Sequence, residues 1–228
     1  MSHITDRCLI IFARYPEKGQ VKSRLACDYD EKFIADLYGH FVDDLLSILS
    51  RGNYCLKIAF HPPEKFEAMK ERFGVGYKYM PQCGGNLGEK MQDAFQRCFT
   101  DQFRSVILIG SDCPDLDVEV IDSSFEALEE TADVAIGPAH DGGYYLIGFT
   151  DDAFHPGIFN DMPWGDLSVY RKTMEKIDIG NVRIHRAPVW RDIDTRADLE
   201  ALIRKHHKSP FCHLKTMTFI QGSRTGRS

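Results

Sequence analysis

The sequence predicts an α/β fold with three layers, α/β/α, built on a mostly parallel central sheet. Short β-rich runs that end in Gly, Pro or Asp alternate with helical patterns along nearly the whole chain, as in α/β layer folds. The run Val106-Ile107-Leu108-Ile109 is apolar throughout, which is expected of a central strand covered on both faces. The 228 residues are enough for one domain with a sizeable core.

The first half of the predicted fold follows from hydrophobic periodicity. Arg7–Ala13 is predicted as a strand because it is apolar on both faces, and Glu31–Arg51 as a helix because its apolar residues recur in steps of three and four. His61-Pro62-Pro63 closes a second strand. The remaining segments expected here are the strands Tyr54–Phe60 and Gly76–Met80, a helix at Glu64–Arg72 and a helix within Asn86–Phe103.

The second half begins with the central strand, Ser105–Gly110. The helix predicted at Asp117–Glu130 turns Val118, Ile121 and Phe125 inward, and Thr195 is a plausible N-cap for the last helix. The expected segments are the strands Asp133–Gly137, Gly143–Phe149 and Val182–Ala187 and the helices Asp117–Glu130, Leu167–Lys176 and Thr195–His207.

We interpret residues 1–208 as a single domain and residues 209–228 as a C-terminal tail. The tail is basic, and its one apolar stretch, His213–Ile220, reads as a strand. It would dock on an edge of the sheet or on a second subunit, which leaves a homodimer open.

Composition excludes several classes of function. The net charge of −6 argues against a duplex nucleic-acid binder, which needs a basic face. No apolar stretch approaches the roughly 18 residues of a membrane span, and residues 1–7 lack the apolar core of a secretory signal. The seven Cys include no C-x-x-C pair, which favours reduced thiols in the cytoplasm over disulfides or a zinc site.

The loop after the first predicted strand is rich in basic residues. Because ligands of open α/β sheets bind at the carboxyl ends of strands, Arg14, Lys22 and Arg24 could neutralise a di- or triphosphate, and Gly19 would let the backbone approach it. The loop matches neither the Walker nor the G-x-G-x-x-G pattern. A solvated basic loop is about equally compatible with its composition.

Carboxylates follow two other segments. Asp112 comes directly after the central strand and is pinned by Pro114, a position suited to Mg²⁺ or Mn²⁺; the alternative is a helix cap, which Asp115 or Asp117 could also supply. Asp192 and Asp194 precede the last helix and could complete the metal site. Alone, they are better explained as helix-capping groups.

Three further segments could shape a pocket. Gln82 and the glycine-rich bend after it, with Gly85 and Gly88, could contact a base. His140-Asp141-Gly142-Gly143-Tyr144 places a carboxylate beside two glycines, so Asp141 could orient or deprotonate an acceptor hydroxyl, unless the segment is only a tight hairpin turn. Trp164 offers an aromatic face for stacking or is simply a core residue.

The order of these motifs carries more information than any one of them. The sequence reads Phe12-Ala13-Arg14-x-Pro-x-x-Gly, then Gln82-x-Gly-Gly-Asn-Leu-Gly-Glu89, Gly110-Ser-Asp112-x-Pro, Asp141-Gly-Gly-Tyr-Tyr, Pro163-Trp164 and Asp192-Ile-Asp194-Thr. Over about residues 7–205 this resembles a bacterial family of glycosyltransferase-like proteins with the GT-A, nucleotide-diphospho-sugar transferase fold. Some members are labelled arsenosugar-biosynthesis glycosyltransferases. The molybdenum-cofactor and 2-phospholactate guanylyltransferases are more distantly similar.

The resemblance implies roles for individual residues. Nucleotide binding would fall to the first loop and the glycine-rich bend, that is to Ala13, Arg14, Lys22, Arg24, Gln82, Gly85 and Gly88. The metal would be held by Asp112 with Asp192 or Asp194, and the acceptor would face Asp141, Gly142, Gly143, Tyr144 and Trp164. Asp112 and Asp141 are the expected catalytic residues. Where the family often reads Pro-Trp-Ser-Thr, this chain has Pro163-Trp164-Gly165-Asp166, and the carboxylate of Asp166 could repel an anionic acceptor.

Three functions compete at this point. The leading hypothesis is a Mg²⁺- or Mn²⁺-dependent glycosyltransferase that uses a nucleotide sugar and a small-molecule acceptor. The second is a nucleotidyltransferase that activates a phosphorylated small molecule with a nucleoside triphosphate. The third is a non-catalytic module that binds a nucleotide sugar.

Overall fold

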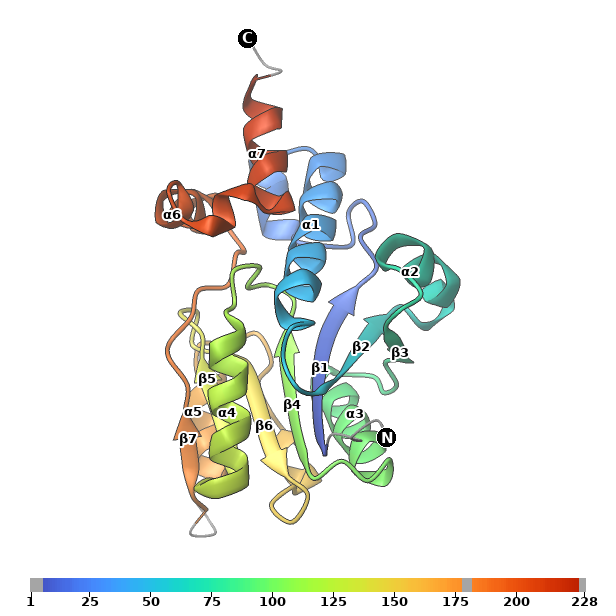
Figure 1. Cartoon of the computed structure of the whole chain (residues 1–228), viewed down its shortest axis with the longest axis vertical. Coiled ribbons are helices and arrows are strands. Elements are labelled where there is room, and N and C mark those ends of the chain that lie inside the picture. Colours follow the sequence, from blue (N-terminus) through green and yellow to red (C-terminus); the bar gives the residue numbers. More distant parts are fainter. Residues whose placement is uncertain (1–5, 178–181, 226–228) are drawn as a thin grey trace.

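The computed structural model describes residues 6–177 and 182–225, which form a seven-stranded sheet between layers of helices (Figure 1). The strand order is β3-β2-β1-β4-β6-β5-β7, and β6 alone among these strands runs antiparallel to its neighbours. The predicted α/β fold with a mostly parallel sheet is therefore confirmed. The strands are β1 (Arg7–Arg14), β2 (Cys55–His61), β3 (Lys78–Pro81), β4 (Ser105–Gly110), β5 (Val134–Pro138), β6 (Tyr144–Thr150) and β7 (Ile184–Arg186).

Several helices begin where a side chain accepts from one of their first backbone N–H groups. Asp30 accepts from the N–H of Phe33, and Asn86 accepts from that of Glu89. Thr195 and Asp198 form a capping box, which confirms Thr195 as an N-cap. The helices are α1 (Glu31–Leu49), α2 (Phe66–Phe73), α3 (Leu87–Thr100), α4 (Val118–Glu130), α5 (Val169–Ile177), α6 (Arg196–His206) and α7 (Lys215–Thr225), with short 3-10 turns at Ser23–Cys27, Pro63–Lys65, Pro156–Phe159 and Pro210–His213.

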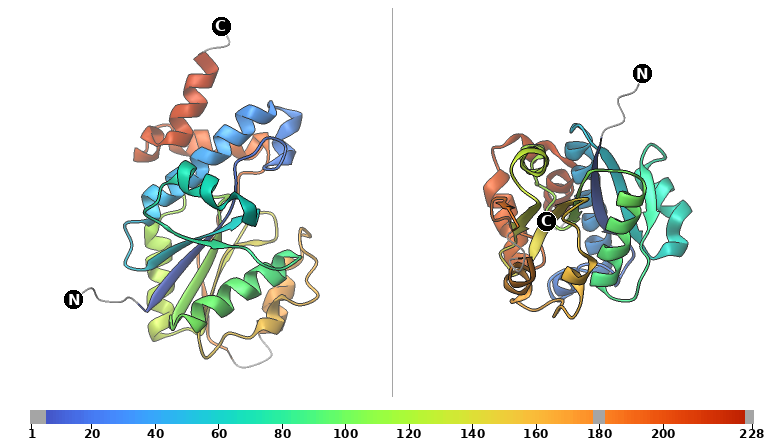
Figure 2. Two further views of the ribbon diagram at one scale, coloured as in Figure 1. Left: turned by 90° about the vertical axis from the view of Figure 1, so that its right-hand side faces the viewer. Right: turned by 90° about the horizontal axis from the view of Figure 1, so that it is seen from below.

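Alternation along the strands divides the core between the two faces of the sheet, and helices cover both faces (Figure 2). In β1, Leu9 and Ile11 pack with α1, α2, α4, α6 and α7. Cys8 and Ile10 point to the opposite face, where α3, α5 and the turn Pro156–Phe159 lie. Both faces of β1 and β4 are thus covered, as their continuous apolar sequences require.

The strand predicted at His213–Ile220 is wrong, because this segment contains most of helix α7. The buried carboxylate of Asp44, in α1, accepts hydrogen bonds from the backbone N–H groups of Lys215 (3.0 Å) and Thr216 (2.8 Å). Asp44 therefore supplies the N-terminal acceptor that the tail's own sequence lacks. Met217 and Ile220, three apart, are buried against the core. Helix α7 of the tail docks on α1 and not on an edge of the sheet (Figure 1).

Within residues 6–177 and 182–225, no helix combines the length and apolar character needed to cross a bilayer.

Candidate functional site

A cleft of about 700 Å³ lies at the end of the sheet where β1 and β4 end and β6 begins. Most of the residues singled out in the sequence line it, although they come from segments far apart in the chain. The singled-out residues in its wall are Ala13, Arg14, Lys22, Arg24, Gln82, Asp112, Asp141, Gly143, Tyr144, Trp164, Asp192 and Asp194. Gly85, Gly88 and Gly142 are not among its lining residues.

Backbone hydrogen bonds bring the acidic segments together. The segments that follow β5 and β7 stay side by side. Ala139 and Trp190 form a bridge, and the N–H of His140 donates to the carbonyl of Trp190 at 3.1 Å. The N–H of Ile193 donates to the carbonyl of Asp112 at 2.9 Å. These bonds place the residues around Ile193 between the segment after β4 and the segment after β5.

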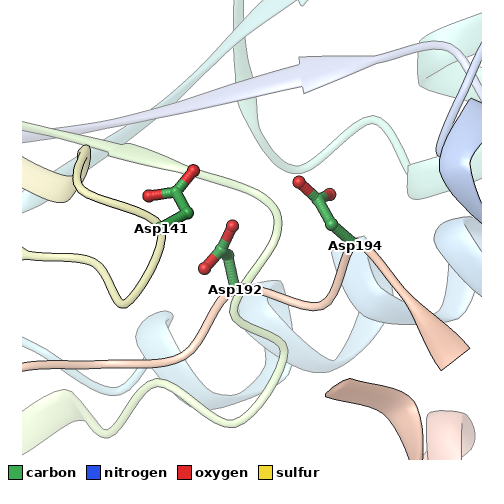
Figure 3. Close-up of side chains that lie close together, drawn as sticks. All are labelled: Asp141, Asp192 and Asp194. Atoms are coloured by element: carbon green, nitrogen blue, oxygen red, sulfur yellow. The ribbon is translucent and has the colours of Figure 1, made fainter. Parts of the chain in front are cut away.

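Asp141, Asp192 and Asp194 consequently form a carboxylate group, with one oxygen from each within 4.8 Å of the others (Figure 3). Asp141 is held by an N–H of Gly143, which donates to its Oδ1 at 2.9 Å. Burial and the negative charge of Asp141 raise the pKa of Asp192 to about 6, and Asp194 adds to the effect. Negative charge therefore outweighs positive charge around the Asp192 carboxylate.

Lys22, from the loop after β1, supplies one positive charge beside this group. Its Nζ lies 2.6 Å from Asp112 Oδ1 and 2.7 Å from Asp194 Oδ1, and its side chain is only 5% exposed. Burial by itself lowers the pKa of Lys22, but the charges of Asp112 and Asp194 outweigh burial and raise it. Lys22 also adopts a left-handed backbone conformation, with φ 48°, which is unfavourable for a residue with a side chain.

The other two basic residues of the loop have weaker contacts. Nη1 of Arg24 lies 3.3 Å from Asp194 Oδ2, and Nη1 of Arg14 donates to the carbonyl of Gln20 at 3.3 Å. Both side chains are largely open to solvent. Arg14, Lys22 and Arg24 thus form a cationic wall of the cleft, and Lys22 and Arg24 of this wall contact the acidic group at Asp194.

Glycines outside the cleft wall shape it indirectly. A Cβ on Gly88 would come within 3.0 Å of the Trp164 ring and closer still to the Phe159 carbonyl, so Gly88 lets Trp164 reach the cleft. Gly142 has φ +86°, and a Cβ there would overlap the backbone of Leu167.

Asp166 also lines the cleft, but its Oδ1 accepts from the N–H of Ser168 at 2.8 Å.

Tyr38 of helix α1 was not predicted from the sequence as a site residue. It connects two segments of the cleft wall. Its hydroxyl accepts from the N–H of Arg14 at 2.9 Å and shares a hydrogen bond with Ser111 Oγ at 2.7 Å. Tyr38 lies in the apolar stripe of α1, and a phenol in that stripe was the only signal available. It fixes the start of the basic loop against the segment that carries Asp112.

The acidic residues fit a hard divalent cation. All the clustered donors are carboxylate oxygens, the ligands that Mg²⁺ and Mn²⁺ take. Their alternative role as helix caps is already filled, because Asp117 caps α4 and Thr195 with Asp198 caps α6. Within the described residues, the side chains of Asp112, Asp192 and Asp194 therefore cap neither α4 nor α6.

Comparisons with known proteins agree with this fold. Residues 45–166 match the family described as "Uncharacterized protein conserved in bacteria (DUF2064)". A protein of Desulfovibrio desulfuricans G20, provisionally named a nucleotide-diphospho-sugar transferase, is 38% identical, and its crystal structure matches with a TM-score of 0.91 over 97% of this chain and 96% of that chain. No curated protein matches the chain.

Two more distant structures share the fold alone. A cytidylyltransferase from Leptospira borgpetersenii is 14% identical, with a TM-score of 0.55 over 97% of this chain and 95% of its own. Rv0371c from Mycobacterium tuberculosis H37Rv, in complex with manganese, is 13% identical, with a TM-score of 0.52 over 88% of this chain and 99% of its own. The fold is that of the nucleotide-diphospho-sugar transferases and their nucleotidyltransferase relatives.

Proposed function

The chain belongs to the bacterial DUF2064 family, and from this premise we propose that it is a metal-dependent transferase that uses a nucleotide-activated donor, a nucleotide sugar whose glycosyl group it passes to a small molecule. One observation carries the proposal. Three basic residues and a group of carboxylates line one cleft of about 700 Å³ at the ligand edge of the sheet, where Lys22 and Arg24 pair with Asp194. A nucleoside diphosphate with its bound cation has the charges that these two sets of residues complement.

The cationic wall suits the phosphates of the donor. Arg14 and Arg24 are open to solvent and can reach an incoming diphosphate. Lys22 would exchange its two carboxylate partners for phosphate oxygens. Ala13 and Gln82 line the neighbouring wall, where the base and ribose would lie, and Gly85 and Gly88 shape the bend beside it.

Asp112, Asp192 and Asp194 would hold Mg²⁺ or Mn²⁺, with Asp141 at the side of the acceptor. When bound, such a cation neutralises the diphosphate and stabilises the nucleoside diphosphate as it leaves. Asp141 belongs to the acidic group and lines the same cleft as Gly143, Tyr144 and Trp164. In an inverting transfer it would orient the acceptor hydroxyl and take its proton, and the hydrogen bond from Gly143 keeps its carboxylate in place.

A nucleotidyltransferase is the second candidate, and the basic loop favours it equally because attack on an α-phosphorus also needs a neutralised triphosphate. The shared fold of the Leptospira cytidylyltransferase is compatible with this candidate. Release of pyrophosphate from a nucleoside triphosphate would distinguish it from glycosyl transfer. A pure binding module, the third candidate, has no need of a metal.

A thermal-shift panel tests the proposal. UDP, GDP, CDP, ADP and the four triphosphates are each added with and without Mn²⁺ to the wild type, to Asp112→Asn and to Asp152→Asn, an exposed control at the far end of the sheet. A ligand at about 100 times its Kd stabilises the fold by about 2.7 kcal/mol. We expect a Mn²⁺-dependent shift with one diphosphate that is lost in Asp112→Asn alone. No shift with any nucleotide would contradict the proposal, and a metal-independent shift would favour the binding module.

A further inference from the structure

Three cysteines gather at the end of the sheet opposite to the cleft. Cys8 is the second residue of β1, Cys55 begins β2, and Cys98 lies on α3. The Sγ atoms of Cys8 and Cys98 are 3.7 Å apart. Cys8 and Cys55 are direct partners in the parallel pairing of β1 with β2.

Two lysines share this face of the sheet. Lys57 lies two residues after Cys55 on β2, and Lys78 is the partner of Lys57 on β3. The Nζ of Lys57 is bound to Asp101 at 2.6 Å. The neighbouring Cys8 thiol lowers the pKa of Cys55 to about 6; burial opposes this effect, and the charges of Lys78 and Lys57 reinforce it.

The three thiols differ in access to solvent. Cys8 and Cys98 are fully buried, whereas Cys55 is half-buried and lines a second cavity of about 450 Å³ together with Tyr77 and Lys78. A small molecule in this cavity would meet Cys55 first. Cys8, buried next to it on β1, would be met only after Cys55.

We propose that Cys55 and Cys8 form a thiol pair that hydroperoxides oxidise to a disulfide, at a site separate from the nucleotide cleft. Neighbouring strands lie about 4.7–4.9 Å apart, and disulfides span Cα separations of about 4.4–6.8 Å. The paired register therefore places the two residues within reach of a bond. Exposed Cys27 and Cys83 have no such arrangement.

The reaction has two steps. The Cys55 thiolate attacks one oxygen of the hydroperoxide, an S–O bond forms, the O–O bond breaks, and the departing oxyanion takes a proton from water. The Cys8 thiol then attacks the sulfur of the sulfenic acid, an S–S bond forms, the S–O bond breaks, and water leaves with the Cys8 proton. The two thiols lose two electrons in total, and the hydroperoxide gains them.

Peptide mapping of the full-length chain tests the proposal. The reduced protein is treated with hydrogen peroxide, remaining thiols are blocked, and disulfides are located by mass spectrometry. We expect a Cys8–Cys55 disulfide as the first product in the wild type and in Cys98→Ala. In Cys8→Ala, Cys55 should be oxidised more slowly because it loses the neighbour that lowers its pKa, and its product should be a sulfenic or more oxidised acid, trapped by a sulfenic-specific reagent.

Three results would overturn the proposal: oxidation of Cys27 and Cys83 ahead of Cys55, a Cys8–Cys98 disulfide as the first product, or no disulfide at all. The wild-type map decides each of them even if a variant does not fold. Cys27→Ala serves as the matched control and should give the wild-type product. Alkylation of Cys55 across pH provides a second measurement, in which its rate should reach half of the plateau near pH 6.

Discussion

The ammonium of Lys22 lies where a cation between Asp112 and Asp194 would lie, so replacing it should improve metal binding in the absence of nucleotide. The Nζ contacts both carboxylates within 2.7 Å. A bound Mn²⁺ must displace this charge or coexist with it, and both cost free energy. In Lys22→Met the carboxylates are left without that counter-charge.

The size of the effect follows from the exposure of the carboxylates. A pair of unit charges about 4 Å apart is worth about 1 kcal/mol in water and about 4 kcal/mol at an effective permittivity near 20. The side chains of Asp112 and Asp194 are 47% and 30% exposed, so the lower part of this range applies. We expect Lys22→Met to tighten Mn²⁺ binding by about 1–2.5 kcal/mol, or roughly fivefold to seventyfold in Kd.

Nucleotide binding should change in the opposite direction, because the phosphates lose a partner. Calorimetric titration with Mn²⁺ alone, and with a diphosphate alone, measures the two effects separately. Lys18→Met is the matched control, since it removes the same charge from an exposed position of the same loop. A Kd for Mn²⁺ that is unchanged or weaker in a folded Lys22→Met protein would refute the reasoning.

Three further predictions concern single carboxylates. Asp44→Ala should lower the free energy of unfolding by about 1–3 kcal/mol in urea melts, because two buried N–H groups at the start of α7 lose their acceptor; Asp44→Asn, which keeps one acceptor, should lose less. Asp115→Ala should lower the free energy of unfolding by about 2 kcal/mol in the same assay. Trp190 Nε1 and Lys205 Nζ both bond to the buried Asp115 carboxylate, and Lys205 is half exposed, which limits the loss. An unchanged melt would contradict this. The Kd for Mn²⁺ should be constant above about pH 7 and rise by up to tenfold per unit below pH 6, as Asp192 binds a proton; Asp192→Asn should remove this pH dependence.

Local patterns predicted the sheet because its strands carry their information in their own residues. Val106-Ile107-Leu108-Ile109 can be buried on both faces only in a central strand, and β4 has β1 and β6 as neighbours. Helix α7 was not predictable in this way. The acceptor for its first N–H groups is Asp44, 171 residues earlier in the chain, and the short apolar run in the tail fits a strand equally well.

The candidate site was predictable in part for a similar reason. The rule that ligands bind at the carboxyl ends of strands brings Arg14 and Asp112 to one edge of the sheet without any knowledge of side-chain contacts. The approach of Asp141 to Asp192 depends on the pairing of Ala139 with Trp190 beyond the ends of β5 and β7. No local pattern encodes that pairing, nor the burial of Lys22 between two carboxylates.

The acidic group itself argues for a functional role, because it destabilises the fold at neutral pH. The pKa of Asp192 is raised to about 6 in the folded chain from an ordinary value near 3.8. Below about pH 4 the carboxyl is protonated in both states and costs nothing. Between about pH 4 and 6 the unfolded chain releases the proton more readily, and above about pH 6 the full penalty is present. Asp117, Thr195 and Asp198 already perform the local capping, so a carboxylate kept at such a cost is better explained by a cation that it binds.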